Sequence, residues 1–279
     1  MHLIRLPLPV FLFLAFSFVG SAGFFAQSEF GTTHDSINWV DVKGLKQGKF
    51  RKVDKEGKAI YEGVFKNDKP TGTFRYFDED GKVTAVSVFS KDGKSCHTTT
   101  YHRNGNKWAF GKYINQQRDS VWTFFAPDTF LVARETYLGG KRNGASFIYL
   151  PDGGIIEQSI WKNGIEDGPW KEFYEDGKVK SEGTYVNGCL EGIVSHYCPE
   201  GGMRIQCAYH NCLSHGQWLF YTCGKSKPDH IVIYKNGKQI GEPYPNMDKM
   251  VKDGLEEFKE RNEKEHEGDP AKEENDGGN

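Results

Sequence analysis

Glycine recurs along this chain at a strict interval of 24 residues. The series comprises Gly48, Gly72, Gly144, Gly168, Gly192 and Gly216, and its two gaps hold Cys96 and Ser120. A second series follows nine residues later, at Gly57, Gly81, Gly105, Gly153, Gly177 and Gly201. A fixed period over eight registers predicts a repeat protein. Recurring residues of such arrays serve the scaffold, so we expect these glycines to shape turns or bulges and not to contact a ligand.

Two aromatic series share this period. One reads Val53, Phe77, Tyr101, Phe125, Tyr149, Phe173, Tyr197 and Tyr221. The other reads Phe65, Phe89, Tyr113, Tyr137, Trp161, Tyr185, Tyr209 and Tyr234, the last member one residue late. Turn signals such as Asn163-Gly164 separate the short apolar runs, and they favour hairpins because these residues tolerate positive φ. Each unit therefore predicts two short strands and two turns, in an antiparallel meander held by cross-strand aromatic pairs.

Two arrangements of the second strands fit the pattern. A further series reads Phe50, Phe74, Thr98, Trp122, Ser146, Trp170, Val194 and Trp218. It lies three residues before the aromatic series that starts at Val53, and residues three apart on a regular strand point to opposite faces. Either both faces are partly apolar, or a bulge bends each second strand. The repeats fit a single twisted sheet, a solenoid-like half-pipe or a closed roll.

The repeated motif resembles a known repeat family. A clean copy, Glu62–Gly81, reads EGVFKNDKPTGTFRYFDEDG, and Ser159–Gly177 and Ser181–Gly201 keep its pattern. This pattern resembles the MORN repeat, and more closely the variant MORN repeat of the bacterial YwqK-type family, over residues 44–241 in about eight copies. The resemblance implies an all-β hairpin array that binds protein partners or lies near membranes. YwqK-type proteins are often labelled antitoxins.

Two copies depart from this pattern. Ser87–Gly105 has Cys96 and Thr98 in place of the expected glycine and aromatic residue, and the unit around Ser120 has Thr129 in place of the turn glycine. Many units carry Trp or Phe where the usual MORN unit has a second glycine, which favours the variant branch. The matched positions are structural, so the resemblance transfers no catalytic or binding residue.

The N-terminus has the order of a secretory signal. Arg5 precedes the apolar run Val10–Val19, and small residues follow it. This order predicts a signal peptide over residues 1–26, with cleavage between Ala22 and Gln27. A retained membrane anchor is the alternative, because the apolar stretch is long enough to cross a bilayer. Either alternative predicts an exported chain that is periplasmic, extracellular or bound to the cell envelope.

The two ends differ in composition from the repeats. A lead-in over residues 27–43 precedes the repeat domain at 44–241, and the tail 242–279 carries thirteen acidic and six basic residues. The pattern of Met247–His266 predicts one charged helix, and the chain beyond Gly268 has the composition of a disordered segment. We expect the tail to cap the array with a polar surface. The alternative is an acidic arm that contacts a partner or the array.

Five of the six cysteines lie in the last two clear repeats: Cys189, Cys198, Cys207, Cys212 and Cys223. In an exported chain, disulfides among the last four of these are the first expectation, with their connectivity open. Unpaired buried thiols are the second. The third is a zinc site in which Cys198, Cys207 and Cys212 join His196, His210 and His215, although no C-x₂-C pair is present. Our prediction is that the chain holds no metal.

No catalytic signature is present in the sequence. It lacks a G-x-S-x-G elbow, an H-E-x-x-H helix, a P-loop and a dinucleotide fingerprint. The 24-residue register leaves no insertion that could build a pocket, so we expect no cofactor and no small-molecule substrate. The net charge is −2 and basic clusters such as Lys49–Lys52 are short, which argues against a nucleic-acid partner.

These features predict a non-enzymatic exported scaffold that binds a protein or peptide at the cell envelope. Tryptophan is favoured at interface hot spots, so the candidate contacts are Trp122, Trp161, Trp170 and Trp218. Packing within the sheet is the alternative role for each of them. Two further hypotheses are an antitoxin or immunity-like protein, suggested by the resemblance, and a membrane-surface module with peripheral lipid contact.

Overall fold

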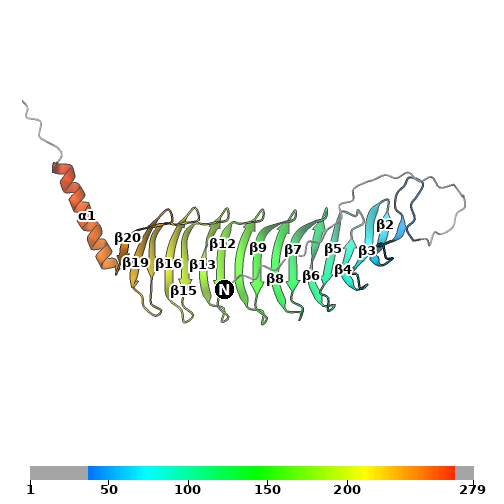
Figure 1. Cartoon of the computed structure of the whole chain (residues 1–279), viewed down its shortest axis with the longest axis horizontal. Coiled ribbons are helices and arrows are strands. Elements are labelled where there is room, and N and C mark those ends of the chain that lie inside the picture. The colour runs from blue at the N-terminus through cyan, green and yellow to red at the C-terminus, as the bar shows by residue number, and fades with distance from the viewer. Residues whose placement is uncertain (1–36, 268–279) are drawn as a thin grey trace, which may run out of the picture. The chain divides into compact units, whose positions relative to one another are not determined.

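The computed structural model describes residues 37–267, which form one antiparallel sheet followed by a helix (Figure 1). The strands are β1 (Gly48–Val53), β2 (Ala59–Lys66), β3 (Lys69–Phe77), β4 (Val83–Phe89), β5 (Ser95–Tyr101), β6 (Lys107–Ile114), β7 (Gln117–Phe125), β8 (Leu131–Leu138), β9 (Lys141–Tyr149), β10 (Ile155–Lys162), β11 (Ile165–Glu166), β12 (Gly168–Phe173), β13 (Val179–Val186), β14 (Cys189–Leu190), β15 (Gly192–Tyr197), β16 (Met203–His210), β17 (Leu213–Ser214), β18 (Gly216–Phe220), β19 (His230–Lys235) and β20 (Lys238–Tyr244). The helix α1 (Met247–Glu267) coincides with the predicted charged helix. Among the described residues, no helix is both long and apolar enough to cross a membrane. The predicted signal peptide, most of the lead-in and the tail beyond Gly268 lie outside the described residues.

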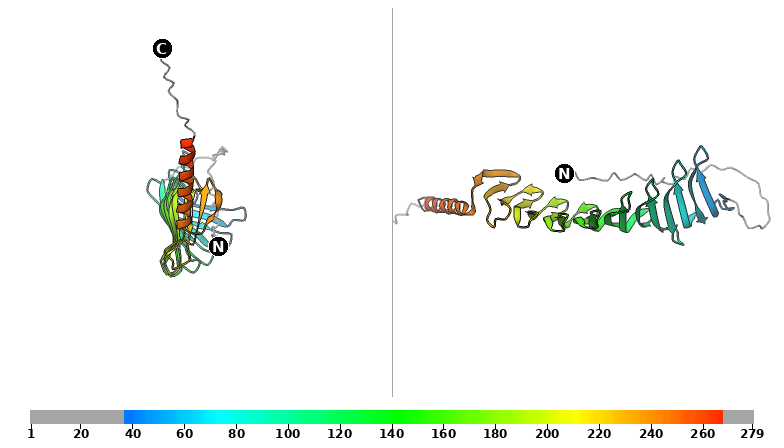
Figure 2. Two further views of the ribbon diagram at one scale, coloured as in Figure 1. Left: turned by 90° about the vertical axis from the view of Figure 1, so that its left-hand side faces the viewer. Right: turned by 90° about the horizontal axis from the view of Figure 1, so that it is seen from below.

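The strands follow one another in space in the order of the sequence. Each pairs antiparallel with its neighbour along the chain, from β1 with β2 to β19 with β20. The short strands β11, β14 and β17 belong to second strands that resume as β12, β15 and β18. Successive strands turn relative to one another (Figure 2). The predicted meander is confirmed, and among the three shapes considered it is the single open sheet.

Two kinds of turn form the two long edges of this sheet. Rim A consists of the tight turns 67–68, 115–116, 139–140, 163–164, 187–188, 211–212 and 236–237, together with the longer turn 90–94. Both turn residues have positive φ, as in Asn187 and Gly188. From 139–140 onward, each turn is hydrogen-bonded to the strand that follows the preceding turn, as where the Gly188 amide donates to the Glu166 carbonyl of β11 at 2.8 Å. Rim B consists of the turns that hold the second glycine series, together with the equivalent turns at 126–130 and 221–229. In one of them the Gly81 amide donates to the Asp78 carbonyl at 3.0 Å.

The first glycine series bends the second strands. All six of its members have positive φ. Opposite Gly72 the register of β2 and β3 shifts between Glu62 and Val64, which is the signature of a bulge. Ser120 keeps this conformation with a φ of +60°. Cys96 does not, because β4 and β5 pair without a shift. The bulge therefore persists at one gap of the series and is lost at the other.

Both faces of the sheet carry aromatic side chains. We call the side of the sheet that carries the Trp122 side chain face 1 and the opposite side face 2. On face 1, the Trp122 ring lies 4.9 Å from the Tyr113 ring and 6.3 Å from the Phe124 ring. Phe125 lies three residues after Trp122 and points to face 2, where it stacks on Phe110 with ring centres 6.0 Å apart. The two arrangements considered for the second strands thus occur together, because the strands are bulged and both faces are partly apolar.

Large side chains on face 1 lie over glycines of the preceding strand. The Phe74 ring covers Gly63 and the Trp122 ring covers Gly111, so closely that a Cβ on either glycine would lie 2.4 Å from the ring. Phe74 is 3% exposed and Trp122 is 1% exposed. An aromatic ring laid over a glycine of the adjacent strand shields the backbone there. This size match is how a single-layer sheet obtains buried residues.

The two outer edges are protected in different ways. At β1, the Asn38 amide donates to the Lys49 carbonyl at 2.8 Å, and the Asn38 side chain bonds to the Arg51 backbone at 2.8 and 3.0 Å. At β20, Pro243 supplies no N–H group, and Gly241 has positive φ where the pairing with β19 is irregular. Both devices hinder pairing with another strand. The array is thereby capped as a unit with defined ends.

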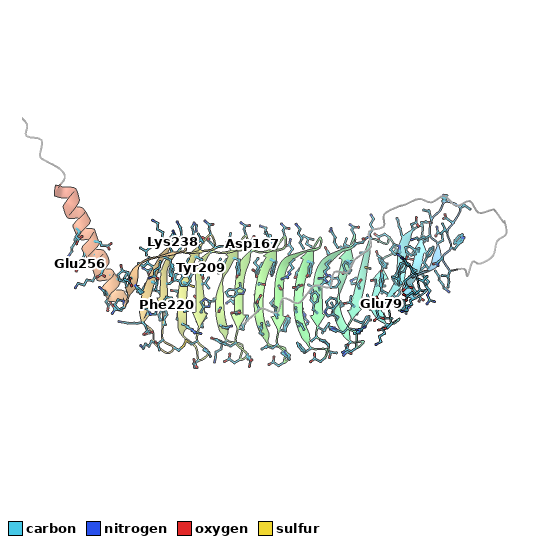
Figure 3. All side chains as sticks on the ribbon, in the orientation of Figure 1. Glu79, Asp167, Tyr209, Phe220, Lys238 and Glu256 are labelled. Atoms are coloured by element: carbon cyan, nitrogen blue, oxygen red, sulfur yellow. A yellow bond between two sulfur atoms is a disulfide. The ribbon has the colours of Figure 1, made fainter. Side chains whose placement is uncertain are left out.

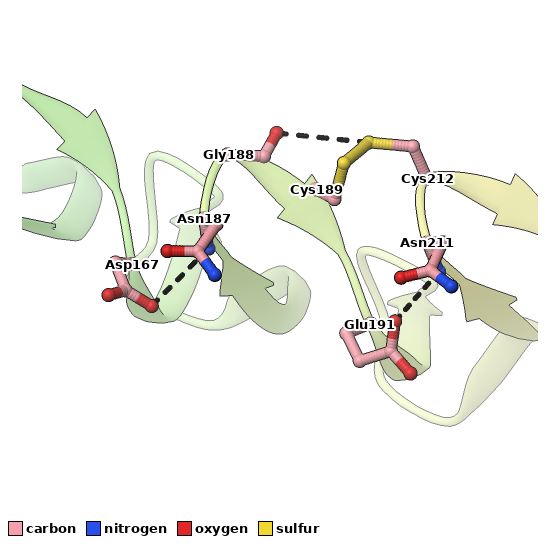
Figure 4. The surroundings of a disulfide bond; sticks show 7 residues. All are labelled: Asp167, Asn187, Gly188, Cys189, Glu191, Asn211 and Cys212. Atoms are coloured by element: carbon pink, nitrogen blue, oxygen red, sulfur yellow. Dashed lines mark hydrogen bonds between the residues drawn. A yellow bond between two sulfur atoms is a disulfide. The ribbon is translucent and has the colours of Figure 1, made fainter.

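Two disulfides join the last repeats, one on each rim. Cys189–Cys212 connects successive turns on rim A (Figure 4), and Cys198–Cys223 connects successive turns on rim B. Cys207 is free and 1% exposed. The prediction of Cys207 as a disulfide partner is therefore wrong, and Cys189 takes part instead. The physical reason is position, since Cys207 lies inside β16 while the four paired cysteines lie at rims, where turns of successive repeats meet.

The disulfide on rim A takes the place of a packing contact made by its neighbours. A Cβ at Gly188 would lie 3.0 Å from Cγ2 of Ile165, so the Ile165 side chain packs directly against that turn. Cys189 and Cys212 stand 24 residues after Ile165 and Gly188. Cys212 keeps the positive φ of the turn, at +67°. The covalent bond is therefore built on the backbone geometry of the ordinary contact between repeats.

Candidate functional site

One row of side chains crosses face 1 from strand to strand, because each member pairs with the next. Up to β9 the row reads Tyr61, Tyr76, Ala85, Thr100, Ala109, Phe124, Ala133 and Ile148, and from β16 it continues as Ile205, Phe220 and His230. Between these segments lie four polar residues, Glu157, Glu172, Ser181 and His196, which we call the polar row. Equivalent positions elsewhere are mostly apolar, so the fold alone does not require this change.

The polar row places two carboxylates directly opposite each other. Glu157 and Glu172 form a cross-strand pair, and like charges in such a pair are destabilising. Burial raises the pKa of Glu157, and Glu166 and Glu172 raise it further against the opposing effect of Arg142. The Lys180 ammonium lies 3.5 Å from the Glu172 carboxylate. Within residues 37–267 the Glu157 carboxylate has no ion-pair or hydrogen-bond partner of its own.

The remaining two members are hydrogen-bonded to each other. The Ser181 hydroxyl oxygen lies 2.9 Å from Nδ1 of His196, and Ser181 is 3% exposed. Burial lowers the pKa of His196, while Glu172 opposes that shift. A catalytic relay needs the imidazole between the hydroxyl and the carboxylate. Here the serine strand lies in the middle, and the Glu172 strand is about 10 Å from the His196 strand. These three side chains therefore do not form a nucleophilic triad.

Cations lie over aromatic side chains on face 1. The Arg118 guanidinium lies 4.7 Å from the centre of the Trp122 ring and 5.4 Å from that of Tyr137, and it donates to the Tyr137 hydroxyl at 3.2 Å. The Arg142 guanidinium lies 4.1 Å from the centre of the Trp161 ring. Such contacts combine electrostatic attraction with packing of the arginine stem. Face 1 thus joins aromatic rings to charged groups across several repeats.

The four predicted tryptophans do not share one environment. Trp122 is 1% exposed, and its Nε1 donates to the Lys112 carbonyl at 3.1 Å. That position leaves no ring surface for a partner, so the structure assigns Trp122 to packing and corrects its prediction as a contact. Trp161, Trp170 and Trp218 are half-buried on face 1 and stay candidates.

The half-buried tryptophans are held by their neighbours. Trp161 Nε1 donates to the Ser159 hydroxyl at 2.9 Å. The Trp218 ring lies 5.4 Å from the Tyr209 ring and 6.4 Å from the Phe220 ring, and the last two residues are labelled in Figure 3. Rings fixed in this way lose little further conformational entropy on binding. They can therefore serve as preorganised contacts.

The residues considered for a zinc site are engaged elsewhere. Cys198 and Cys212 are in disulfides. Burial raises the pKa of the Cys207 thiol to about 11, which disfavours the thiolate that binds metal. His210 Nδ1 lies 2.8 Å from the Glu191 carboxylate. In the part of the chain that the structure describes, no group of three or more His, Cys, Asp or Glu residues could hold a metal ion.

Comparison with known families gives one match. The family model described as MORN repeat variant matches residues 166–187, which cover one structural repeat from β11 through β13 to the next turn on rim A. This match supports a MORN-repeat protein, and proteins built on such scaffolds are typically non-enzymatic. No curated protein matches the chain.

Proposed function

We propose that this chain is an exported, non-enzymatic repeat scaffold that binds a protein or peptide partner on face 1. The observation that carries the proposal is the polar row, in which four successive strands change from apolar to polar at one position. Half-buried Trp161 and Trp170 lie on the same face as this row. A mixture of aromatic and charged side chains on a rigid support is the composition expected of a recognition surface.

The shape of the described surface also favours binding over catalysis. Catalytic sites need a concave, water-excluding pocket. One hollow of the described residues is an open depression beside rim B, lined by residues that include Asp78, Tyr101, His102 and Arg103. An extended partner laid across several strands fits an open sheet better than a small substrate does. The partner would contact several repeats at once.

Export is part of the proposal, and the disulfides support it. Cys189–Cys212 and Cys198–Cys223 would persist in an oxidising compartment and are rare in the cytosol. They agree with the secretory signal predicted from the sequence. Fusion of residues 1–36 to a reporter enzyme that is active only after export tests this step. A reporter confined to the cytoplasm would contradict it.

Binding is tested by comparing matched substitutions on the two faces. The chain starting at Gln27 is immobilised and exposed to its native envelope fraction, and retained proteins are identified by mass spectrometry. Trp170→Ala and Trp161→Ala remove aromatic surface from face 1, whereas Phe110→Ala removes it from face 2, where that side chain is 43% exposed. We expect one dominant partner that the face 1 variants lose and the face 2 variant keeps. Equal retention by all folded variants would refute the proposal.

The finer assignment to the YwqK-type branch, with its antitoxin label, is a narrower form of this proposal. It is supported by the frequent Trp or Phe at the position where the usual MORN unit has a second glycine. It predicts that the retained partner is a toxin encoded next to this chain. Co-expression should then lower the toxicity of that neighbour, and unchanged toxicity would remove the antitoxin form while leaving the scaffold in place.

A further inference from the structure

At one position of the repeat on face 1, the side chain is a cation in some repeats and an anion in another. Arg118 lies opposite Tyr113 in the pairing of β6 with β7, and Glu166 lies opposite Trp161 in the pairing of β10 with β11. These are equivalent positions two repeats apart, and Arg142 holds the same position in the repeat between them. Two repeats therefore carry a cation at this point, and the next repeat carries an anion.

The first of these repeats shows what the position does when a cation is present. The Arg118 guanidinium lies over the rings of Trp122 and Tyr137, within the range of a cation–π contact. The rings at the same places around Glu166 are those of Trp170 and Tyr185, with centres 6.1 Å apart. Over the described residues, no lysine or arginine lies over either of these two rings. This repeat supplies the aromatic half of the contact without its cation.

Three carboxylates lie near this aromatic pair. Glu172 follows Trp170 by two residues on β12 and so points to the same face, Glu157 lies opposite Glu172, and Glu166 is two residues before the partner of Tyr185 in the sheet. Burial raises the pKa of Tyr185, and these three carboxylates raise it further. Lys180 lies 3.5 Å from Glu172 and offsets one of these charges. The surface around Tyr185 is therefore both aromatic and negatively charged.

The nearest arginine does not fill the space. The Arg142 guanidinium stacks over Trp161, and its Nε lies 3.5 Å from the Glu135 carboxylate. Arg142 also lowers the pKa of Glu166 and Glu157 and is therefore within electrostatic reach of both carboxylates. Its guanidinium nevertheless lies over Trp161, so a cation over the Trp170 and Tyr185 rings would have to come from outside residues 37–267.

We propose that the partner places a positively charged side chain, arginine above all, over Trp170 and Tyr185, where Glu166, Glu157 and Glu172 hold its charge. This inference rests on the proposed function and specifies the chemistry of the partner. Arginine fits best because its planar guanidinium stacks on aromatic rings and binds carboxylates through two parallel hydrogen bonds. The occupant is a basic segment of a protein, and Arg118 on Trp122 is the chain's own copy of the contact.

A charged peptide and its neutral analogue test the site directly. The probe is a fluorescent hexa-arginine peptide, the matched control is hexa-citrulline, and binding is followed by fluorescence anisotropy at low ionic strength. Glu166→Gln removes one charge-assisted contact and should weaken hexa-arginine binding about tenfold. Glu79→Gln, an exposed carboxylate on rim B, should leave the affinity unchanged (Figure 3). Added salt should weaken binding to the wild type more than to Glu166→Gln.

A charge reversal gives the sharper test. In Glu166→Arg the chain supplies its own guanidinium, which should lie over Trp170 and Tyr185 as Arg118 lies over Trp122. We expect hexa-arginine binding to disappear while the melting temperature is unchanged or raised. Wild-type affinity for hexa-arginine in Glu166→Gln and Glu166→Arg would overturn the inference, and so would equal binding of hexa-citrulline.

Failure of this inference is distinguishable from failure of the proposed function. If the native partner is lost in Trp170→Ala but kept in Glu166→Arg, face 1 binds the partner without an inserted cation, and only the inference falls. If Trp161→Ala, Trp170→Ala and Glu166→Arg all leave the partner bound, the proposed function falls as well. Loss of the native partner in Trp170→Ala and Glu166→Arg, with both folded, supports both statements.

Discussion

Replacing Gly111 by alanine tests the size match that buries the core of this single-layer sheet. Gly111 does not have positive φ, so alanine introduces no backbone strain at this position. Its Cβ would instead lie 2.4 Å from the Trp122 indole, whereas carbon atoms in favourable contact are about 3.5–4 Å apart. The indole must therefore withdraw by more than 1 Å, roughly the difference between these separations.

The magnitude follows from what Trp122 loses. A buried tryptophan removes up to about 250 Å² from water, and exposing roughly a fifth of that area costs about 1.3 kcal/mol. Loss of the hydrogen bond to the Lys112 carbonyl and of the contact with Arg118 adds about 1 kcal/mol each. The lower entropy of the unfolded alanine chain returns about 0.7 kcal/mol. We expect Gly111→Ala to lower the free energy of unfolding by about 2–3 kcal/mol.

Urea denaturation followed by far-ultraviolet circular dichroism measures this loss. The chain contains its own control one repeat earlier, where Ser87 and Thr98 form the equivalent pair with hydroxyl oxygens 2.7 Å apart. In a Trp122→Thr background, Gly111→Ser should cost much less than it does with the indole present, which a double-mutant cycle detects. The reasoning is refuted if Gly111→Ala matches or exceeds the wild type in stability, since the entropic term alone predicts that result.

Three other predictions concern departures from the repeat. Thr129 has a φ of +80° at a position that glycine holds in most other repeats. Urea denaturation should therefore show that Thr129→Gly raises the free energy of unfolding by about 1 kcal/mol, whereas Gly105→Thr, one repeat earlier, should lower it. An increase in both variants would contradict this prediction. Cys189→Ser opens the 23-residue loop closed by the Cys189–Cys212 disulfide and should lower the free energy of unfolding by about 3 kcal/mol. The double variant Cys189→Ile, Cys212→Gly restores the contact that Ile165 makes with Gly188 and should lower it by less. Equal losses of stability in both, measured without reductant, would argue against that contact. The raised pKa of Glu157 means that the stability it contributes is present in acid and lost as pH rises through its folded pKa. Glu157→Gln should therefore raise the melting temperature at pH 7 and have little effect in acid, and a pH-independent difference would exclude this cause.

Local geometry was predictable wherever one residue type has a single physical reason to recur. The hairpins followed from Asn-Gly turns such as Asn163-Gly164, and positive φ at the glycine series followed from the absence of a Cβ. The offset between Trp122 and Phe125 gave two alternatives, and the structure contains both. A bulge depends on the register of two strands, so a periodic pattern in one strand cannot show that bulge and apolar faces coexist.

Contacts between repeats were harder to predict. The strand order makes Cys207 a plausible disulfide partner, because its strand neighbours that of Cys198, yet a disulfide needs Cβ atoms within about 4.5 Å and directed at each other. That condition is met at the rims, where Cys189 faces Cys212. Cys189 occupies the same repeat position as Ile165, 24 residues earlier, and the sequence alone shows this. That the side chain at this position lies close to the next rim A turn depends on hydrogen bonds such as that from the Gly188 amide to the Glu166 carbonyl, which the sequence does not show.

Periodicity does not reveal the polar row, because a periodic pattern consists of residues that recur and the row consists of residues that do not. Aligning the repeats in register shows Glu172 where other units have Tyr76 or Phe124, and Glu157 where they have Ala85 or Ala109. That alignment alone could have found the row. The opposition of Glu157 and Glu172 required the strand pairing.

A repeat array supplies its own reference, because each position is sampled several times in one chain. Around Cys96, the change of residue coincides with loss of the bulge. The polar row is different, since Glu172 keeps the bulge beside Phe173 and its strand begins at Gly168 with positive φ. Residues 166–187, which include Glu172, are those that match the MORN repeat variant model. Drift would erode geometry and chemistry together. Here the chemistry of one face changes on an intact backbone, which is the pattern that the proposed binding surface predicts.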